Sequence, residues 1–338
     1  MKLSTILIVA ATSVFVTAML GFVLIPFLKR LKYGQTILDI GPKWHEKTKQ
    51  GTPTMGGLMF IAGIVAAFTV GYIFLWLEGA VTFDAVGQAA AFGSISGILL
   101  AVCFGFVGFV DDFIKVKKKH NEGLNVRQKF LLQCLVVAAF FTARYISGDT
   151  STVIRFPYLG QLDLWYFYYV VVGLAIIYIV NAVNITDGID GLCSSVSFIY
   201  FLVFAIIAAT IGNSGMTVLA VAAAGGCIGF LFWNFHPAKV FMGDTGSLFL
   251  GGIVVALGIG CGAEVIMVMA AAVFIWEALT VLIQTTYFKL THGKRLFKMT
   301  PIHHSFELRG WREVKIVAVF SLIAIVFGAL SVILAAGL

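Results

Sequence analysis

The chain contains ten runs of predominantly apolar residues, each close to the length of a helix that crosses a lipid bilayer. These runs cover residues 4–28, 55–77, 89–110, 129–146, 164–183, 193–211, 216–233, 247–261, 265–288 and 315–337. A membrane-spanning helix needs about 20 mostly apolar residues, and within hydrocarbon its backbone polar groups must pair inside the segment. The pattern therefore predicts an all-α polytopic membrane protein with about ten transmembrane helices, and a single integral-membrane domain over residues 1–338.

The composition agrees with a membrane protein and excludes several other classes. Of the 338 residues, 60% are apolar and 12% are charged, whereas soluble domains are about 45–50% apolar and about 25% charged. A soluble enzyme, a disordered chain and a secreted disulfide scaffold are thus excluded. The net charge of +7 does not indicate nucleic-acid binding, because no soluble stretch is long enough to fold a basic module. The five cysteines lie in or beside apolar runs, so we interpret them as small hydrophobic residues.

The distribution of positive charge predicts the orientation of the helices. Of the 23 Lys and Arg residues, only Lys2, Arg144 and Arg155 fall outside one alternate set of loops. That set consists of 29–54, 111–129, 289–315 and the short connection at Lys239. Because cytoplasmic loops carry the excess of Lys and Arg, we expect these loops in the cytoplasm and both termini outside it. The active site is then expected at the cytoplasmic face.

Five aspartates lie at the predicted cytoplasmic ends of helices, namely Asp111, Asp112, Asp187, Asp190 and Asp244. Charged residues that border membrane spans are costly and usually functional. Adjacent residues do not share a helix face, so the first two should diverge, one toward a metal or substrate and the other toward a neighbouring base. The pair is equally compatible with a purely local role, in which it ends the helix and binds Lys115 and its neighbours.

The segment NAVNITDGIDGL over residues 181–192 brings further carboxylates and amides to the mouth of two spans. Asn184, Asp187 and Asp190 are spaced by three residues, which in helical or turn geometry directs them toward one side. Glycines beside them permit left-handed backbone and close approach of a ligand. An ordinary turn explains the glycines but not this set of polar groups, so the segment favours a functional site.

The segment FWNFHPAKVFMGDTGSL over residues 232–248 has the same character. Asp244 lies between two glycines just before an apolar run, and an acidic residue in such a turn suits Mg²⁺, which prefers carboxylate, water and phosphate oxygens. Phe241 offers a flat face to a base, although a lipid-facing or core position is the simpler explanation of that aromatic residue. We therefore predict a magnesium ligand at Asp244.

The last large loop combines His303 and His304 with many Lys and Arg residues. Two adjacent histidines without a thiolate or an HExxH spacing are a weak zinc signal, and the surrounding cations favour phosphate binding. The chain has neither a GxxxxGK[ST] nor a GxGxxG pattern, so ATP and NAD lack support. Carboxylates suited to Mg²⁺ beside basic clusters are what phosphoryl transfer to a lipid phosphate requires.

At these residues the sequence resembles the phospho-N-acetylmuramoyl-pentapeptide-transferase family. The resemblance is carried, in order, by GTPTMGG (51–57), FVDDF (109–113), NAVNITDGIDGL (181–192), FMGDTGSL (241–248) and PIHHSFE (301–307). It implies a multi-pass enzyme of the bacterial plasma membrane that works in peptidoglycan synthesis. The implied reaction is the Mg²⁺-dependent transfer of phospho-MurNAc-pentapeptide from UDP-MurNAc-pentapeptide to undecaprenyl phosphate, which releases UMP. The family also implies a homodimer.

The resemblance assigns a role to each matching residue. It implies that Asp244 binds Mg²⁺ and that Asp111 and Asp112 bind the lipid phosphate or assist its deprotonation, with His303 and His304 supporting the diphosphate or sugar. The implied substrate-binding residues are Lys49, Thr54, Lys119, Arg127, Lys129, Asn184, Asp187, Asp190, Asn234 and Phe241, the last stacking on uracil. Where the family usually has a third consecutive histidine, this chain has Ser305, and serine cannot supply a cation.

Two alternatives to this function remain. A UDP-GlcNAc polyprenyl-phosphate GlcNAc-1-phosphate transferase of the same superfamily differs in its donor. A carboxylate-based transporter would place acids near the bilayer midplane in broken helices, whereas the five aspartates border cytoplasmic ends. Glu277 is the exception because it falls inside the ninth run, where it marks either a polar kink or a partner for a basic loop residue.

Overall fold

The computed structural model describes residues 1–31, 49, 51–80, 85–118 and 123–337. Its helices are α1 (Leu3–Arg30), α3 (Gly57–Leu77), α4 (Ala85–Lys118), α5 (Val126–Ile146), α6 (Phe167–Thr186), α7 (Leu192–Thr210), α8 (Ser214–Asn234), α9 (Gly243–Gly260), α10 (Glu264–Ala270), α11 (Ala272–Leu290), α12 (Ile302–Glu307) and α13 (Glu313–Ala335). In the described ranges, nine helices are long and apolar enough to cross a membrane alone, and the bent pair α10–α11 brings the number to ten. The prediction of about ten spans is confirmed.

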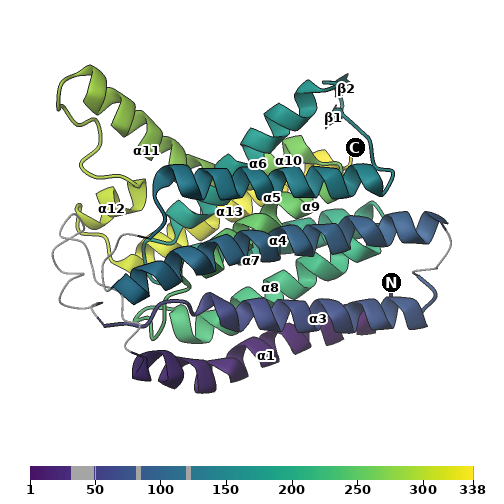
Figure 1. Cartoon of the computed structure of the whole chain (residues 1–338), viewed down its shortest axis with the longest axis horizontal. Helices are drawn as coiled ribbons and strands as arrows, with labels where there is room; N and C mark the ends of the chain where they lie inside the picture. Colours follow the sequence, from purple (N-terminus) through teal and green to yellow (C-terminus); the bar gives the residue numbers. More distant parts are fainter. Residues whose placement is uncertain (32–48, 50, 81–84, 119–122, 338) are drawn as a thin grey trace.

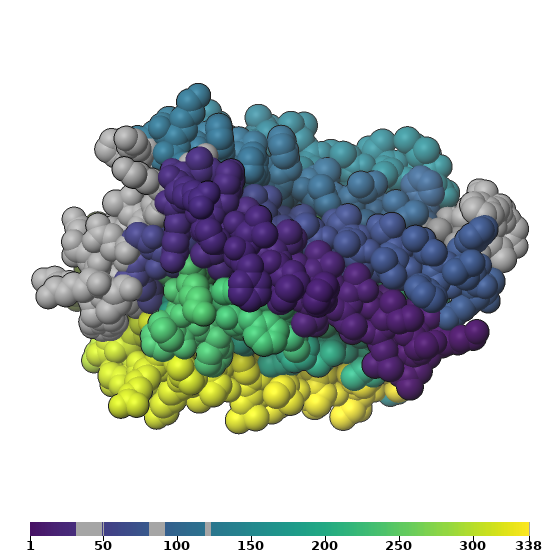
Figure 2. Space-filling model, turned by 90° about the horizontal axis from the view of Figure 1, so that it is seen from below, coloured from purple at the N-terminus to yellow at the C-terminus, as the bar shows by residue number. Residues whose placement is uncertain are grey.

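The long helices form one bundle, and the two chain ends lie at the same end of it (Figure 1). We call this the hairpin end, because β1 (Val153–Phe156) and β2 (Gly160–Asp163) also lie there. The opposite end carries α12, and we call it the α12 end. Seen from below, α1 lies obliquely across the surface (Figure 2), where it packs against α3 and α8.

The centre of the bundle is formed by α8 and α9, whose apolar windows are each 83% buried. Glycine allows the neighbouring helices to approach α9 at backbone distance. A Cβ atom at Gly108 of α4 would lie 2.1 Å from the carbonyl oxygen of Asp244, and one at Gly57 of α3 would lie 2.3 Å from Cα of Gly246. These contacts bring motifs of three helices together around the first turn of α9.

The structure differs from the predicted elements in two of the spans. The ninth run is not one straight helix, because α10 and α11 meet at a bend of 74° near Ala271. Figure 1 shows α11 leaving the bundle, and its exposed Trp276 and Leu290 suit lipid. Apolar length predicts that a segment spans but not its direction, which packing decides. In the third span, α4 continues past residue 110 to Lys118, and the lysines of its last turn favour the helix C-terminus.

The purely α-helical prediction is wrong in one small region between α5 and α6. Strands β1 and β2 pair as an antiparallel hairpin in which Val153 lies opposite Asp163 and Phe156 opposite Gly160. Each strand has only four residues, too few for an alternating pattern to stand out in the sequence. All five cysteines are free, in agreement with their interpretation as small hydrophobic residues.

Candidate active site

The first turn of α9 is held by a carboxylate from α4. Oδ2 of Asp112 accepts hydrogen bonds from the backbone N–H (2.8 Å) and the hydroxyl (2.7 Å) of Thr245, and Oδ1 accepts from the N–H of Asp244 (3.2 Å). The first N–H groups of a helix have no partner within it, and a negative charge there is favourable. Asp112 thus caps α9 and fixes the position of Asp244.

Asp111, the adjacent residue, points elsewhere. Its Oδ1 accepts from the N–H of Leu124 (2.7 Å), and its Oδ2 lies 2.5 Å from Nζ of Lys115. A Cβ atom at residue 123 would lie 2.5 Å from Oδ1, so Gly123 allows the loop before α5 to close over the carboxylate. The predicted divergence of Asp111 and Asp112 is confirmed. The alternative pairing with Lys115 is also present, but α4 does not end there.

Asp244 collects side chains from three other helices. Its Oδ2 lies 2.9 Å from Nζ of Lys115 on α4 and 2.9 Å from Nζ of Lys129 on α5. Its Oδ1 accepts a hydrogen bond of 2.8 Å from Nδ2 of Asn184 on α6. Each of Asp111, Asp112 and Asp244, which we call the carboxylate cluster, offers an oxygen within 4.8 Å of the others. Three carboxylates with two ammonium groups thus form a dense charged site.

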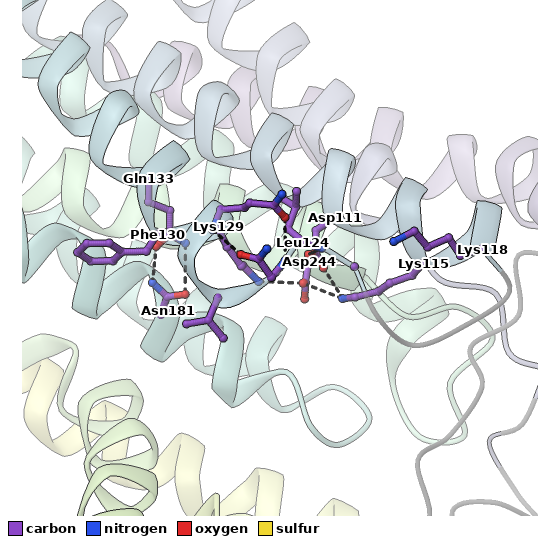
Figure 3. A pocket seen from close by; sticks show the side chains of 13 residues that line it. Asp111, Lys115, Lys118, Leu124, Lys129, Phe130, Gln133, Asn181 and Asp244 are labelled. Carbon is purple, nitrogen blue, oxygen red and sulfur yellow. Dashed lines mark hydrogen bonds and ion pairs between the residues drawn. The ribbon is translucent and has the colours of Figure 1, made fainter.

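A cavity of about 920 Å³ opens beside this cluster. Asp111, Asp244, Lys115 and Lys129 line it (Figure 3), whereas the carboxylate of Asp112 faces the backbone of α9. Further along, the lining includes Leu124, Val126, Phe130 and the reciprocally hydrogen-bonded amides of Gln133 and Asn181. The lining therefore combines charged groups beside the carboxylate cluster with apolar and amide side chains, an arrangement that fits a molecule with an anionic head and a hydrocarbon portion.

A second polar cluster is built around Lys49, which is buried. Its Nζ lies 2.8 Å from Oδ1 of Asp190 and 2.7 Å from Oε2 of Glu313, and Nδ1 of His236 lies 3.1 Å from Oδ2 of Asp190. We call these four residues the Lys49 cluster. Burial opposes ionisation of Asp190, but the Lys49 ammonium outweighs it and holds the pKa of that carboxyl below its usual value.

Asp187 follows the last residue of α6 and is half-buried. Burial, together with the negative charges of Asp244, Asp112 and Asp190, raises the pKa of the Asp187 carboxyl to about 8. Among the described residues no hydrogen bond or ion pair holds this carboxylate. The expectation that Asn184, Asp187 and Asp190 act on one side is only partly met, because α6 ends between them. Asn184 donates to Asp244 of the carboxylate cluster, whereas Asp190 pairs with Lys49.

The two adjacent histidines have different surroundings. His303 is fully buried, with Nδ1 3.1 Å from Oε2 of Glu277, whereas His304 is partly exposed, with Nδ1 2.6 Å from Oε2 of Glu307. Glu277 is thus the partner of a basic loop residue, the second of the two interpretations of that glutamate. Ser305 donates to the carbonyl of Met299 (2.6 Å) and accepts from its N–H (3.1 Å), so at this position serine closes a loop.

Two of the predicted substrate residues belong to the scaffold between the motifs. Asn234 is buried, accepts from the N–H of Gly191 (3.2 Å) and donates to the carbonyl of Val240 (3.0 Å). Phe241 is half-buried, and its backbone N–H donates to the carbonyl of Pro53 (2.9 Å). These bonds join three motifs that are distant in sequence.

The remaining predicted residues are placed as follows. Thr54 lies beside the start of α9, since a Cβ at Gly243 would be 2.8 Å from its hydroxyl oxygen. Arg127 is exposed on the first turn of α5, two residues before Lys129. Lys119 lies outside the described residues. Of the predicted residues, the structure places Lys129 and Asn184 with the carboxylate cluster and Asp190 with Lys49. Thr54 lies beside the start of α9, and Arg127 is left at the surface.

Several residues of these clusters were not predicted as functional. They are Lys115, His236, Glu277, Glu313, Gln133 and Asn181. Asn181 is the first residue of a recognised motif and Lys115 lies two residues after another, so their closeness to these motifs in sequence was a usable signal. His236 and Glu313 reach Asp190 from positions 46 and 123 residues away in sequence, and no local spacing indicates such a contact.

Comparisons with known proteins identify relatives of this chain. The profile of Glycosyl transferase family 4 matches residues 94–262, and phospho-N-acetylmuramoyl-pentapeptide-transferase signature 1 matches residues 49–61. The chain is 41% identical over 330 residues to the phospho-N-acetylmuramoyl-pentapeptide-transferase of Geobacillus kaustophilus, with 97% of each chain covered. The enzymes of that name from Heliobacterium modesticaldum and Listeria monocytogenes are 42% and 41% identical, with 94% of each chain covered.

The matches extend over both polar clusters and nearly all of the spans. The signature begins at Lys49, and the family profile includes Asp111, Asp112, Asp190 and Asp244. Identity of about 40% over almost the whole of both chains far exceeds what a shared membrane composition produces. The chain belongs to the phospho-N-acetylmuramoyl-pentapeptide-transferase family.

Proposed function

We propose that this chain transfers phospho-MurNAc-pentapeptide from UDP-MurNAc-pentapeptide to undecaprenyl phosphate. The products are undecaprenyl-diphospho-MurNAc-pentapeptide (lipid I) and UMP, and the reaction belongs to peptidoglycan synthesis. The observation that carries the proposal is the convergence of Asp111, Asp244, Lys115 and Lys129 at one cavity, in a chain that is multi-pass and has bacterial relatives of that name.

The donor atoms of the carboxylate cluster fit Mg²⁺. Asp111 and Asp244 offer oxygen ligands at the cavity, and Mg²⁺ is usually bound by one or two carboxylates together with water and substrate phosphates. When bound, the ion would neutralise negative charge on the phosphoryl oxygens. Asp244 is the principal ligand in this proposal, and Asp112 acts by holding the helix that carries it.

The chain's own cations support the handling of phosphates. Lys115 and Lys129 reach the same oxygen of Asp244 from two helices, so both ammonium groups lie where a phosphate at the cavity meets them. Ammonium and metal together stabilise the charge that develops in phosphoryl transfer. Arg127 and Lys119, beside these residues in sequence, are proposed to act on the acceptor phosphate.

The Lys49 cluster and Asp187 are proposed to meet the nucleotide end of the donor. The two clusters are joined through the 184–190 segment, since Asn184 bonds Asp244 and Asp190 binds Lys49. Thr54 lies beside the start of α9, and the segments 53–57 and 241–242, which carry Thr54 and Phe241, are hydrogen-bonded to each other. We place uracil against Phe241 and the diphosphate between the clusters, with His304 on its exposed side.

The proposed chemistry is direct attack. An oxygen of the lipid phosphate forms a bond to the β-phosphorus of the UDP donor, the bond from that phosphorus to the bridging oxygen breaks, and UMP leaves with the electron pair. The acceptor is already anionic at neutral pH and needs little activation. Each aspartate of the cluster is held by hydrogen-bond donors or ammonium groups, which makes it a weaker nucleophile than the free phosphate for a two-step route.

We further propose that the α12 end faces the cytoplasm and that the chain forms one catalytic domain in the plasma membrane. The support is the excess of Lys and Arg in the loops that join the motifs. Both termini, at the hairpin end, then lie outside the cytoplasm. A homodimer is proposed from family membership alone.

The test is UMP release by detergent-solubilised protein with Mg²⁺ and undecaprenyl phosphate. UDP-MurNAc-pentapeptide and UDP-GlcNAc are offered separately, and EDTA is added to a matched sample. We expect release only with the muramoyl donor, and its loss with EDTA. Release only with UDP-GlcNAc would assign the chain to the sister transferases. Folded protein that is silent with both donors would contradict the enzyme proposal and favour a transporter.

A further inference from the structure

Two fully buried ionisable side chains face each other where α11 meets α12. Glu277 and His303 are each 0% exposed, and Nδ1 of His303 lies 3.1 Å from Oε2 of Glu277. Within the described part of the chain, neither side chain has a hydrogen-bond partner, and the close approach of these two groups is the ion-pair contact that each makes. Burying polar groups without compensation is costly, so each of these groups depends on the other.

The opposite edge of the imidazole packs on the backbone of the 187–190 turn. A Cβ atom at residue 188 would lie 2.2 Å from Nε2 and 2.6 Å from Cε1 of His303, so only Gly188 leaves room for the ring. The ring is also in edge contact with His304, their centroids 4.2 Å apart. His303 therefore lies behind the turn, while Asp187 and Asp190 project from it.

These contacts form a continuous path from the broken span to the site. Glu277 is the only carboxylate in the described residues that contacts this imidazole, and it lies on the Nδ1 side of the ring. The Nε2 side of the ring faces the turn. Neither group is exposed to the cavity, so neither can touch a reacting atom from this position.

We propose that Glu277 is a positioning residue for the transfer reaction. Its carboxylate orients the His303 imidazole, and the imidazole supports the turn that presents Asp187 and Asp190. The inference rests on the proposed function, because the turn affects turnover only if it meets the nucleotide donor. The inference gives the two histidines different roles. His303 packs against the turn at Gly188 and supports it, and partly exposed His304 remains available to the substrate.

The experiment compares Glu277→Leu, His303→Leu, the double variant and Glu277→Gln. The matched control is Glu264→Leu, because Glu264 is also a buried glutamate of the broken span but lies at the hairpin end beside Tyr168. Steady-state kcat and KM for UDP-MurNAc-pentapeptide are measured together with Tm. Hydrogen–deuterium exchange of the peptide covering 183–192 is measured without any substrate.

We expect Glu277→Leu and His303→Leu each to lower kcat/KM about tenfold to a hundredfold, the range known for partners that orient metal-binding histidines. The double variant should lose no more than either single variant, because the two side chains act as a unit. Glu277→Gln should stay within about fivefold of the wild type, since its amide has the same shape and still offers the buried imidazole a polar neighbour. Exchange in the turn should increase in both leucine variants and remain unchanged in Glu264→Leu.

Equal losses in Glu277→Leu and Glu264→Leu, additive losses in the double variant, or an unchanged turn would each overturn the proposal. The exchange measurement needs no substrate, so it still decides the role of Glu277 if the wild-type protein turns over neither donor. If Glu277→Leu does not fold, Gly188→Ala tests the same contact, because its methyl group must displace the imidazole. Wild-type kcat in a folded Gly188→Ala protein would refute the inference.

Discussion

Both ends of the bundle carry carboxylates, but they partner them differently. At the hairpin end the exposed Asp149 lies 2.6 Å from Nη2 of Arg144, and the buried Glu264 accepts a hydrogen bond of 2.9 Å from the hydroxyl of Tyr168. At the α12 end, Asp111, Asp112 and Asp244 crowd within 4.8 Å of one another.

This difference indicates that the carboxylates at the hairpin end stabilise the fold, whereas those at the α12 end take part in the reaction. One-to-one pairing satisfies a polar group at a helix end and serves stability. Like charges held together weaken the folded state unless a ligand or metal compensates them, and such crowding is typical of functional sites. Lys115 and Lys129 reduce the repulsion among these three carboxylates but are fewer than the carboxylates that they contact. Substitutions should therefore affect activity at one end and stability at the other.

The largest expected effect is at Asp244. Asp244→Asn should lower kcat by about a thousandfold, because it removes the carboxylate proposed to hold Mg²⁺ at the transferring phosphoryl group. Its amide keeps the shape of the side chain, so Tm should change by no more than about 3 °C. UMP release and thermal unfolding are measured on the same preparation, with Asp149→Asn at the hairpin end as the control. Near-wild-type turnover in Asp244→Asn would remove the metal assignment.

Within the α12 end, the adjacent residues Asp111 and Asp112 should differ in how much each contributes to stability. Asp111→Asn and Asp112→Asn should both reduce kcat by about a hundredfold. Asp112→Asn should in addition lower Tm by about 3–6 °C, because an amide nitrogen cannot accept from both donors of Thr245 and leaves buried donors unpaired. Asp111→Asn keeps an oxygen for Leu124 and should unfold close to the wild-type temperature. Equal Tm values in the two variants would contradict the capping role of Asp112.

Much of this organisation could be predicted from the sequence. A long apolar run indicates that a segment lies in lipid, so the ends of most spans were predicted to within a few residues. The Asp-Gly motifs were recognised because glycine turns and charges beside apolar helices have few structural explanations, whereas Lys49 was named through the family resemblance. The pairing of Asp111 with Lys115 was one of two alternatives, and the two residues lie one helical turn apart.

The direction in which a helix runs, and the contacts between residues distant in sequence, could not be predicted. A helix that is apolar all round carries no pattern that says which face is buried, so nothing indicated that α11 bends away from α10. His303 and His304 are adjacent and chemically identical, and only the packed structure shows that Glu277 and Gly188 enclose one of them. Contacts between distant segments, such as Lys49 with Glu313, depend on the tertiary fold.

The carboxylate of Asp187 provides a pH-dependent test. Its pKa is raised to about 8, so the folded state favours the protonated form. The stability that the protonated form gives is fully present below about pH 4, where the unfolded carboxyl also keeps its proton, and is lost as pH rises from about 4 to about 8. In EDTA, Asp187→Asn should therefore raise Tm by about 2–4 °C at pH 9 and leave it nearly unchanged at pH 4. Thermal unfolding across this pH range checks the sign. An Asp187→Asn protein that is less stable at pH 9 would show that the charged form is favoured instead.

The smallest effect on activity is expected at the hairpin end, where Tyr168 donates to Glu264. Tyr168→Phe removes this hydroxyl and leaves the buried carboxylate with no hydrogen-bond donor among the described side chains, at a cost of about 1–3 kcal/mol. Tm should fall by about 3–6 °C, while kcat at 25 °C should remain within about twofold because no contact of this pair reaches the cavity. Thermal unfolding and UMP release test both parts. If kcat fell more than tenfold in folded Tyr168→Phe protein, the two ends would be coupled through the broken span, and the separation of anchoring from chemistry would fail.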